Sequence, residues 1–339
     1  MSPRQSNGKL TILRRFQLFY FHNSIIFIFI ALIVVSGILS DKFFTFRNWM
    51  NILTNFSVLG IVACGVSLVL IAGGIDLSFG SILACCAVFA AYLQPKNFLL
   101  AMFLPPLLGT TLGMVNGLIV TQLRTNPLIT TLGTQWAYFA ALMIVTEGHL
   151  VQGKGVGPFH YIGNGKIYGI SMPFVIFFVV GLCVYFVLTR TVFGKYVYAH
   201  GSNKEALFCS GVNTSALYWK IFVAMGFIVG IGGVVLSSRL IGVRPTEGGR
   251  YLINVLTAVI LGGVSLSGGV GSVLNVMIAV LTLGVIDNAM VLFGVAYKDQ
   301  QIIRGSIFIL SVIYNGYLLQ RSDLLRKTLA WSQEELSSE

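Results

Sequence analysis

Long apolar segments separated by short polar ones make up most of this 339-residue chain. About 20 consecutive apolar residues cross a lipid bilayer as a helix. Seven segments approach or exceed that length, an eighth at 173–188 is slightly short, and two at 79–93 and 251–264 are shorter still. The pattern therefore predicts ten membrane helices, two of them short or broken. The seven long segments are 19–39, 52–72, 98–120, 128–145, 217–236, 270–293 and 302–319.

The distribution of basic residues predicts the orientation of these helices. Ten crossings place both termini on the same side of the membrane. Lys and Arg concentrate in the N-terminal tail and in the loop that follows the sixth apolar segment, and basic loops favour the cytoplasmic side. We therefore expect cytoplasmic tails at 1–18 and 320–339, a transmembrane domain at 19–319, and a cytoplasmic loop at 190–217.

Composition agrees with an all-α, polytopic membrane protein. Hydrophobic residues make up 56% of the chain and charged residues only 10%, whereas soluble domains carry roughly a quarter charged residues. The net charge of +11 does not indicate nucleic-acid binding, because basic loops of membrane proteins face anionic lipid head groups. The five Cys and four His residues follow no metal-ligand spacing, so we expect neither a metal nor a cofactor.

A glycine-rich motif occurs twice within nearly uncharged sequence. GGIDLSFG at 73–80 recurs 189 residues later as GGVSLSGG at 262–269, with five of eight positions identical. Polar, flexible backbone is costly in lipid unless protein or water covers it, and transporters interrupt helices in this way near their substrate route. Each copy alone fits a tight turn equally well. The repetition favours equivalent pieces of a transport path that includes Gly73, Gly74, Gly262 and Gly263.

Few other polar residues lie in the apolar segments, and each has two readings. Asp76 fits the N-cap of the following helix at least as well as a substrate contact. Asp287 and Asn288 fit a structural hydrogen-bond network or a transport lumen equally well, because a carboxylate in lipid must be bonded or hydrated. Asn55 and Gln135 are weaker candidates for the same path.

The loop at 190–217 contains a predicted short helix. Ser202 and Glu205 have the spacing of a capping box, in which each side chain bonds a free backbone N–H at the helix start. Gly211 then fits a left-handed helix stop. Taken alone, this helix could lie on the membrane surface or dock another protein.

Four motifs in order resemble one family. They are GGIDLSxGS at 73–81, TLGT at 131–134, GKxxYAxGxNxEA at 194–206 and AVILGGVSLSGG at 258–269. This order resembles the permease subunits of bacterial ABC importers for monosaccharides, the ribose, xylose and galactose branch, over residues 45–317.

The resemblance implies an inner-membrane permease without cofactors that works with three kinds of partner. These are a cytoplasmic ATPase, a periplasmic sugar-binding protein, and a second permease copy or paralogue. It also implies that part of the loop couples the permease to the ATPase. The matching coupling residues are Gly201, Ser202, Asn203, Glu205, Ala206 and Gly211.

No motif supports chemistry by the chain itself. Residues 148–154 imitate the start of a phosphate-binding loop, but Gly155 stands where Ser or Thr would ligate magnesium. No set of nucleophile, base and metal ligands suggests an enzyme. The alternative to an ATP-driven permease subunit is a self-sufficient secondary carrier or channel. Ion-driven transport would usually place carboxylates or His within the membrane, and only Asp76 and Asp287 qualify.

A basic cluster lies in the loop between the seventh and eighth segments. Arg239, Arg244 and Arg250 occur within twelve residues, with Glu247 among them. In the predicted orientation this loop, 237–250, faces outward, as does the glycine-rich loop 147–172. The arginines are either ordinary solvated charges or a landing site for carboxylates of a sugar-binding protein.

Overall fold

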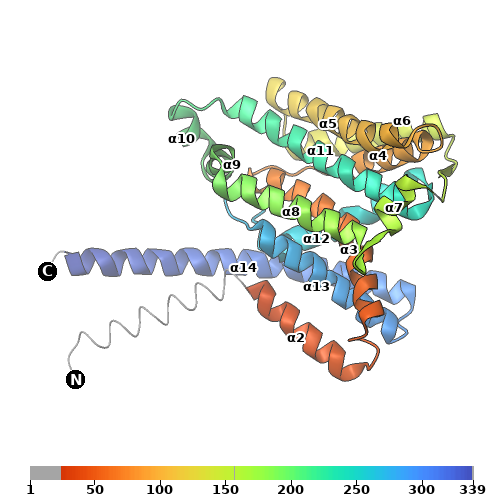
Figure 1. The fold of residues 1–339 in the computed structure, drawn as a ribbon. Helices are drawn as coiled ribbons and strands as arrows, with labels where there is room; N and C mark the ends of the chain where they lie inside the picture. Colours follow the sequence, from red (N-terminus) through yellow and green to blue (C-terminus); the bar gives the residue numbers. More distant parts are fainter. Residues whose placement is uncertain (1–23, 156, 338–339) are drawn as a thin grey trace.

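The computed structural model describes the backbone of residues 24–155 and 157–337 and is almost entirely helical (Figure 1). The predicted N-terminal tail at 1–18 and the start of the first apolar segment lie outside the described residues. The helices are α2 (Ser24–Leu39), α3 (Phe46–Ile71), α4 (Phe79–Leu93), α5 (Phe98–Gln122), α6 (Pro127–Thr146), α7 (Pro158–Asn164), α8 (Met172–Arg190), α9 (Val192–Ser202), α10 (Lys204–Cys209), α11 (Thr214–Leu240), α12 (Gly249–Leu261), α13 (Val273–Leu292) and α14 (Tyr297–Ser337).

Each of the ten apolar segments predicted from the sequence coincides with one of these helices. Within the part of the chain that the structure describes, six helices are long and apolar enough to cross a membrane, and α2 and α4 are shorter apolar helices. The protein is therefore a polytopic, all-α membrane protein. The expected short segments correspond to α4, with 15 residues, and α12, with 13 residues. α14 continues to Ser337, so the predicted domain boundary at 319 is not a helix end.

Local sequence explains several helix starts. Thr45, Asn97 and Asn126 accept hydrogen bonds from backbone N–H groups in the first turns of α3, α5 and α6, which otherwise lack partners. Pro127 occupies the first turn of α6, where its missing N–H costs least.

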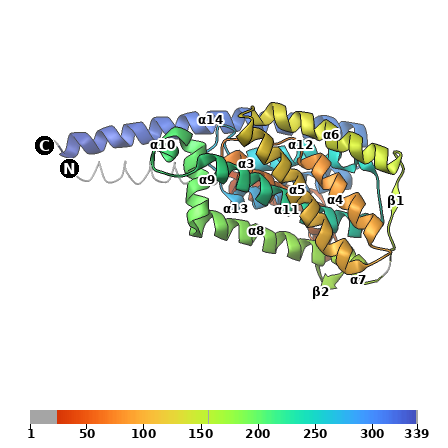
Figure 2. The same cartoon turned by 90° about the horizontal axis from the view of Figure 1, so that it is seen from above.

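The two loops predicted to share one face do lie together. β1 (Val151–Gln152) pairs antiparallel with β4 (Gly242–Val243), which joins the loop before α7 to the loop after α11. A second small hairpin, β2 (Lys166–Ile167) with β3 (Ile170–Ser171), and the 3-10 helix η1 (Pro245–Gly248) belong to the same loops. Figures 1 and 2 place α7 at one end of the molecule and α9 and α10 at the other.

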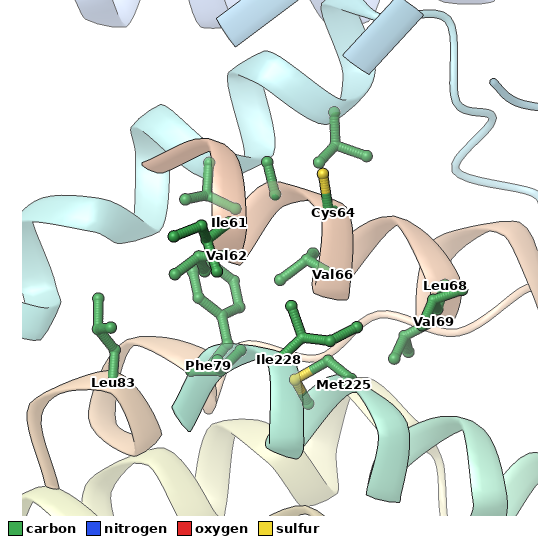
Figure 3. Close-up of a cluster of buried hydrophobic side chains, with 14 of the residues drawn as sticks. Ile61, Val62, Cys64, Val66, Leu68, Val69, Phe79, Leu83, Met225 and Ile228 are labelled. Carbon is green, nitrogen blue, oxygen red and sulfur yellow. The ribbon is translucent and has the colours of Figure 1, made fainter. Parts of the chain in front are cut away.

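The main apolar core lies among α3, α4 and α11 (Figure 3). Every residue of α3 from 57 to 71 is buried. Phe79 and Leu83 of α4 and Met225 of α11 pack against this stretch.

Glycine allows α5 to approach α11 closely. A side chain on Gly226 of α11 would overlap the backbone of α5 at Gly109, and one on Gly230 would overlap Pro106. In lipid, helices are not driven together by the hydrophobic effect, and van der Waals packing between them contributes instead. Small residues such as these glycines permit the close approach that this packing needs. α5 and α11 therefore pack closely together, and both contact α4.

Candidate functional site

Two glycine-rich connections interrupt the helices. The first glycine connection, residues 72–78, joins α3 to α4, and the second, residues 262–272, joins α12 to α13. Both preceding helices end in the same way. Gly73 and Gly263 have φ of 83° and 81°, and the next N–H groups, of Gly74 and Val264, donate to carbonyls five residues back at 3.0 and 3.2 Å. This is the Schellman helix stop, which favours glycine because its φ is positive.

The residues that end the two helices are not the residues that the sequence repeat pairs with each other; the pairing is shifted by one position. By helix end, Gly73 corresponds to Gly263, not to Gly262. The polar turns keep the 189-residue spacing, since Ser78 N–H donates to Asp76 Oδ1 at 2.6 Å and Ser267 N–H donates to Ser265 Oγ at 3.1 Å. The second connection thus has one residue fewer between its helix stop and its polar turn.

Asp76 anchors a buried polar network at the start of α4. The residue preceding α4 is Ser78, whose side chain makes no capping bond. Its hydroxyl donates to Asp76 Oδ1, Asn116 of α5 donates to the same hydroxyl, and Tyr138 of α6 donates to Asn116. The Asp76 carboxylate thus accepts an N–H at the start of α4, as expected for a capping role, although the residue that directly precedes the helix is Ser78. Its other oxygen, Oδ2, is buried without a partner among the described residues.

The predicted loop helix exists, but its cap is different. α9 continues through Ser202, and Asn203, with an extended backbone, caps α10 by accepting the Ala206 N–H at 2.9 Å. The Ser202–Glu205 capping box is therefore wrong, because Ser202 is still helical and cannot begin the next helix. Gly211 has φ of 83° and donates to the Phe208 carbonyl at 2.9 Å, which confirms the expected left-handed stop.

The end of α9 contacts both glycine connections. His200 Nδ1 donates to the Ala72 carbonyl at 2.8 Å, and Tyr198 donates to the Gly271 carbonyl at 2.9 Å. The Gly269 N–H donates to the Ile71 carbonyl at 2.8 Å, and a side chain on Gly201 would overlap both of these backbones. The structure thus brings together the two repeated motifs and the loop motif. Sequence reasoning assigned no role to His200, and it used Tyr198 only as one position of the loop motif at 194–206.

A cavity of about 780 Å³ opens beside this junction. Gly73, Arg124, His200, Glu205 and Tyr218 are among the residues that line it. We call it the α9 cavity. It separates the α9–α10 loop from the turn between α5 and α6.

A second cavity, of about 650 Å³, lies at the other end of α3. Asn51 and Ile71 are 20 residues apart on one helix, which corresponds to about 30 Å. We call it the asparagine cavity, because five amide side chains line it, together with Asp287, Arg239, Arg250 and Arg304. The five are Asn48, Asn51, Asn55, Asn254 and Asn288.

Most polar groups in the asparagine cavity bond one another. Asp287 of α13 accepts two hydrogen bonds from Arg304 of α14, at 3.0 and 2.9 Å. Asn288 and Asn48 exchange two amide bonds at 2.9 and 2.7 Å. The geometry therefore gives Asp287 and Asn288 bonded partners that tie α13 to α14 and α3, at the wall of a cavity.

The three arginines of the outer loop are not equivalent. Arg239 is half-buried in the asparagine cavity and donates to Asn55. Arg250 is exposed and forms an ion pair with Glu247 at 3.4 Å. Arg244 is exposed. Only Arg244 and Arg250 therefore present charge to the surface.

Gln135 lies away from both cavities. It lines a groove of about 220 Å³ with Gly80, Ser81 and Thr246, which we call the α6 groove. Only Thr131 and Leu142 of α6 are buried, and Trp136 is 62% exposed. A helix face that contacts only lipid is expected to be apolar. The half-exposed Gln135 side chain therefore indicates that this face of α6 contacts something other than lipid.

Comparison with known proteins identifies the family. Residues 48–312 match the family model described as the permease component of the branched-chain amino acid transport system. The chain is 33% identical to the ribose import permease RbsC of Haemophilus influenzae over 86% of this chain and 92% of that protein. It is 34% identical to RbsC of Escherichia coli K12, over 85% of this chain and 91% of that protein. It is 33% identical to the L-arabinose ABC transporter permease AraH of Azospirillum brasilense, over 87% of each.

No solved structure matches the chain. The family match spans both glycine connections, the α9–α10 loop and the polar network of Asp76. The chain belongs to this family of transport-system permease components.

Proposed function

We propose that the chain is the transmembrane permease subunit of an ABC importer that carries a pentose or hexose into the cell. The observation that supports this best is its similarity, along more than four-fifths of its length, to import permeases for ribose and arabinose. A self-sufficient carrier is less well supported. Of the two carboxylates in the apolar region, Asp287 is paired with Arg304 and Asp76 is bonded by Ser78, whereas an ion relay needs groups that exchange protons or ions.

In this proposal the chain crosses the bacterial inner membrane ten times, with both termini in the cytoplasm. α9 and α10 then face the cytoplasm, and the loops joined by β1 and β4 face outward. The separation of these two regions to opposite ends of the molecule supports this orientation (Figures 1 and 2). The asparagine cavity lies on the outer side, and the α9 cavity on the inner side.

The ATPase partner docks on the α9–α10 loop. Phe208 is 67% exposed on this loop, and Glu205 and Ala206 are exposed beside it. An exposed aromatic residue surrounded by polar side chains is typical of a protein-binding surface. The energy for transport comes from this partner, because the chain carries no nucleotide-binding motif.

The sugar route runs past the α6 groove and is completed by a second permease copy. The stretch of α3 from 57 to 71 is wholly buried in the core, which leaves little room for a route through it. The α6 face instead exposes Gly133, Trp136 and Ala137, where small residues allow a second helix to approach. Gln135 would then offer amide hydrogen bonds to sugar hydroxyls at the interface of the two copies.

A sugar-binding protein on the outer side delivers the substrate. Of the three arginines in the outer loop, Arg244 and Arg250 are exposed and would face the carboxylates of that protein. The asparagine cavity adds polar, hydratable surface on the same side of the membrane.

Reconstitution tests the proposal. The permease is placed in liposomes with its ATPase and sugar-binding protein, and uptake of labelled ribose, arabinose and galactose is measured. We expect uptake of at least one of these sugars only when ATP, ATPase and binding protein are all present. Uptake that an ion gradient drives without the ATPase would favour the secondary carrier.

A further inference from the structure

The first glycine connection is bonded to α9 on one side. The His200 ring, only 7% exposed, donates to the Ala72 carbonyl at 2.8 Å. The same ring stacks on Tyr218 of α11, with centroids 4.7 Å apart and planes at 15°. A carbonyl at a helix end has no partner within the helix, so this bond fixes the end of α3 to α9.

The same connection is bonded to α6 on its other side. The Leu77 N–H donates to the Thr131 hydroxyl at 3.1 Å, and that hydroxyl donates to the Pro127 carbonyl of its own helix at 2.8 Å. Thr131 is fully buried. A turn beyond the connection, Ser81 of α4 donates to the Gln135 carbonyl at 2.8 Å. The connection is therefore attached to α6 at Thr131, one turn before Gln135, which borders the α6 groove.

Between these two attachments the backbone has little freedom. The Gly74 N–H is held by Val69, and a side chain on Gly74 would overlap the Tyr218 hydroxyl. Asp76 and Ser78 close the polar turn. A tightly packed, hydrogen-bonded segment transmits a displacement better than a loose loop would, because it cannot absorb the movement locally.

The second connection has a different outer attachment. Tyr198 of α9 donates to Gly271 in it. Asn315 of α14, which is buried, donates to the carbonyls of Ile260 and Val264 at 2.8 and 3.2 Å. α9 is thus bonded through one connection to α6 and through the other to α14.

We propose that the first glycine connection transmits movement of α9 to α6, with His200 and Thr131 as the positioning residues at its two ends. The inference rests on the proposed function, in which an ATPase moves α9 and the sugar passes α6. If the connection transmits the movement, changes at His200 and Thr131, which lie on opposite sides of it, affect transport through the same segment. This energetic coupling between the two side chains can be measured directly.

A double-mutant cycle on the complete reconstituted complex makes that measurement. His200→Phe keeps a ring on Tyr218 but removes the bond to Ala72, and Thr131→Val keeps the shape but removes the hydroxyl. The readout is sugar transported per ATP hydrolysed. We expect each variant to lower this ratio about five-fold, the effect of one lost hydrogen bond, while complex assembly and ATP hydrolysis without binding protein stay unchanged.

The double variant decides the proposal. If both residues act through one connection, His200→Phe with Thr131→Val lowers the ratio no further than the worse single variant. Distant, independent sites give additive effects instead, so a roughly 25-fold loss in the double variant would overturn the proposal. If Thr131→Val does not assemble, Thr131→Ala takes its place in the same cycle.

Matched variants separate loss of the bond from loss of packing. Thr131→Ser retains the hydroxyl and should keep the wild-type ratio. Thr134→Val removes a hydroxyl one turn away that bonds only within α6, and should also keep it. An equal loss in either variant contradicts the proposal. Absence of ATP-driven uptake by the wild-type complex would instead count against the proposed function itself.

Discussion

His200 Nδ1 lies 2.8 Å from the carbonyl oxygen of Ala72, although the two residues are 128 positions apart in the chain. Because a carbonyl only accepts hydrogen bonds, Nδ1 carries the proton and the neutral ring has its lone pair on Nε2. That Nε2 atom is buried without a partner among the described residues. A second proton would therefore create a buried, unpaired charge at the junction of α9 and α3.

The first prediction concerns pH and stability. Burial lowers the pKa of His200, the bond to Ala72 opposes this, and the nearby Lys204 cation lowers it further. The unfolded chain, with an ordinary pKa of about 6.5, then binds a proton before the folded protein does. Stability should fall as the pH drops through about 6.5 and be unaffected above it. Thermal unfolding of the detergent-purified permease from pH 8 to pH 5 checks this.

His200→Phe provides the control for that measurement. The variant has no group to protonate at this position. Between pH 7 and pH 5 its unfolding temperature should therefore fall by less than the unfolding temperature of the wild type. An identical pH slope in His200→Phe and wild type would show that His200 contributes nothing to it.

The second prediction is that Gly74 is intolerant of a side chain because of one neighbour. A methyl group at Gly74 would overlap the Tyr218 hydroxyl. Overpacking of this kind costs typically 1–3 kcal/mol. Gly74→Ala should lower the unfolding temperature in detergent, and the added change Tyr218→Phe should recover part of the loss by removing the overlapping oxygen.

Gly263 provides the comparison within the second connection. It has φ of 81° and no atom close to the position of a side chain, so Gly263→Ala carries only the cost of a left-handed backbone, about 1–2 kcal/mol. Tyr218→Phe should give Gly263→Ala no recovery. Equal recovery of both alanine variants would show that Tyr218 acts on general stability and not on contact with Gly74.

The helices were predictable from the sequence because lipid imposes a simple length and polarity rule. Each predicted apolar segment coincides with a helix, including the short α4 and α12 beside the glycine motifs. Both copies of the repeated motif follow a helix stop, and their role in a transport path stays a prediction. The one-residue shift between Gly73 and Gly263 was not predictable. Aligning identical residues superposes the polar turns, whereas the position of the helix stop depends on the backbone angle φ, which the residue match does not give.

The site was predictable only in part. Asn55, Asp287 and Asn288 share one cavity with Arg239, but no spacing rule reveals that α3 and α13 meet there. The cap of α10 was misassigned because Ser202, Asn203 and Glu205 all have side chains suited to a helix start. Long-range contacts such as that of His200 with Ala72 depend on tertiary packing, which a local pattern does not encode.

The third prediction concerns the proposed ATPase contact. Glu205 is exposed in the first turn of α10, so Glu205→Lys should change the stability of the permease by no more than about 0.5 kcal/mol. Reversing a charge at a docking interface weakens binding by roughly 2–5 kcal/mol when the partner group is desolvated. We expect loss of ATPase capture in a pull-down with unchanged unfolding of the permease.

Glu205→Gln should show an intermediate loss. Wild-type capture by Glu205→Lys would remove Glu205 from the interface.

The last prediction separates the arginines of the outer loop by their environment. Arg244 and Arg250 are exposed, although Arg250 also borders the asparagine cavity. Arg239 donates to Asn55 and to backbone carbonyls within that cavity. If exposed charge attracts the binding protein, Arg244→Gln with Arg250→Gln should slow its capture most at low ionic strength, because salt screens the attraction over about 10 Å at 0.1 M. Arg239→Gln should leave the association rate nearly unchanged and lower stability, since it removes a bonded cation from the cavity wall. Association rates of the binding protein, measured across a salt series for both variants, test this difference between the exposed arginines and Arg239. A rate that depends equally on Arg239 would mean that the binding protein reaches into the cavity and does not dock on the exposed loop alone.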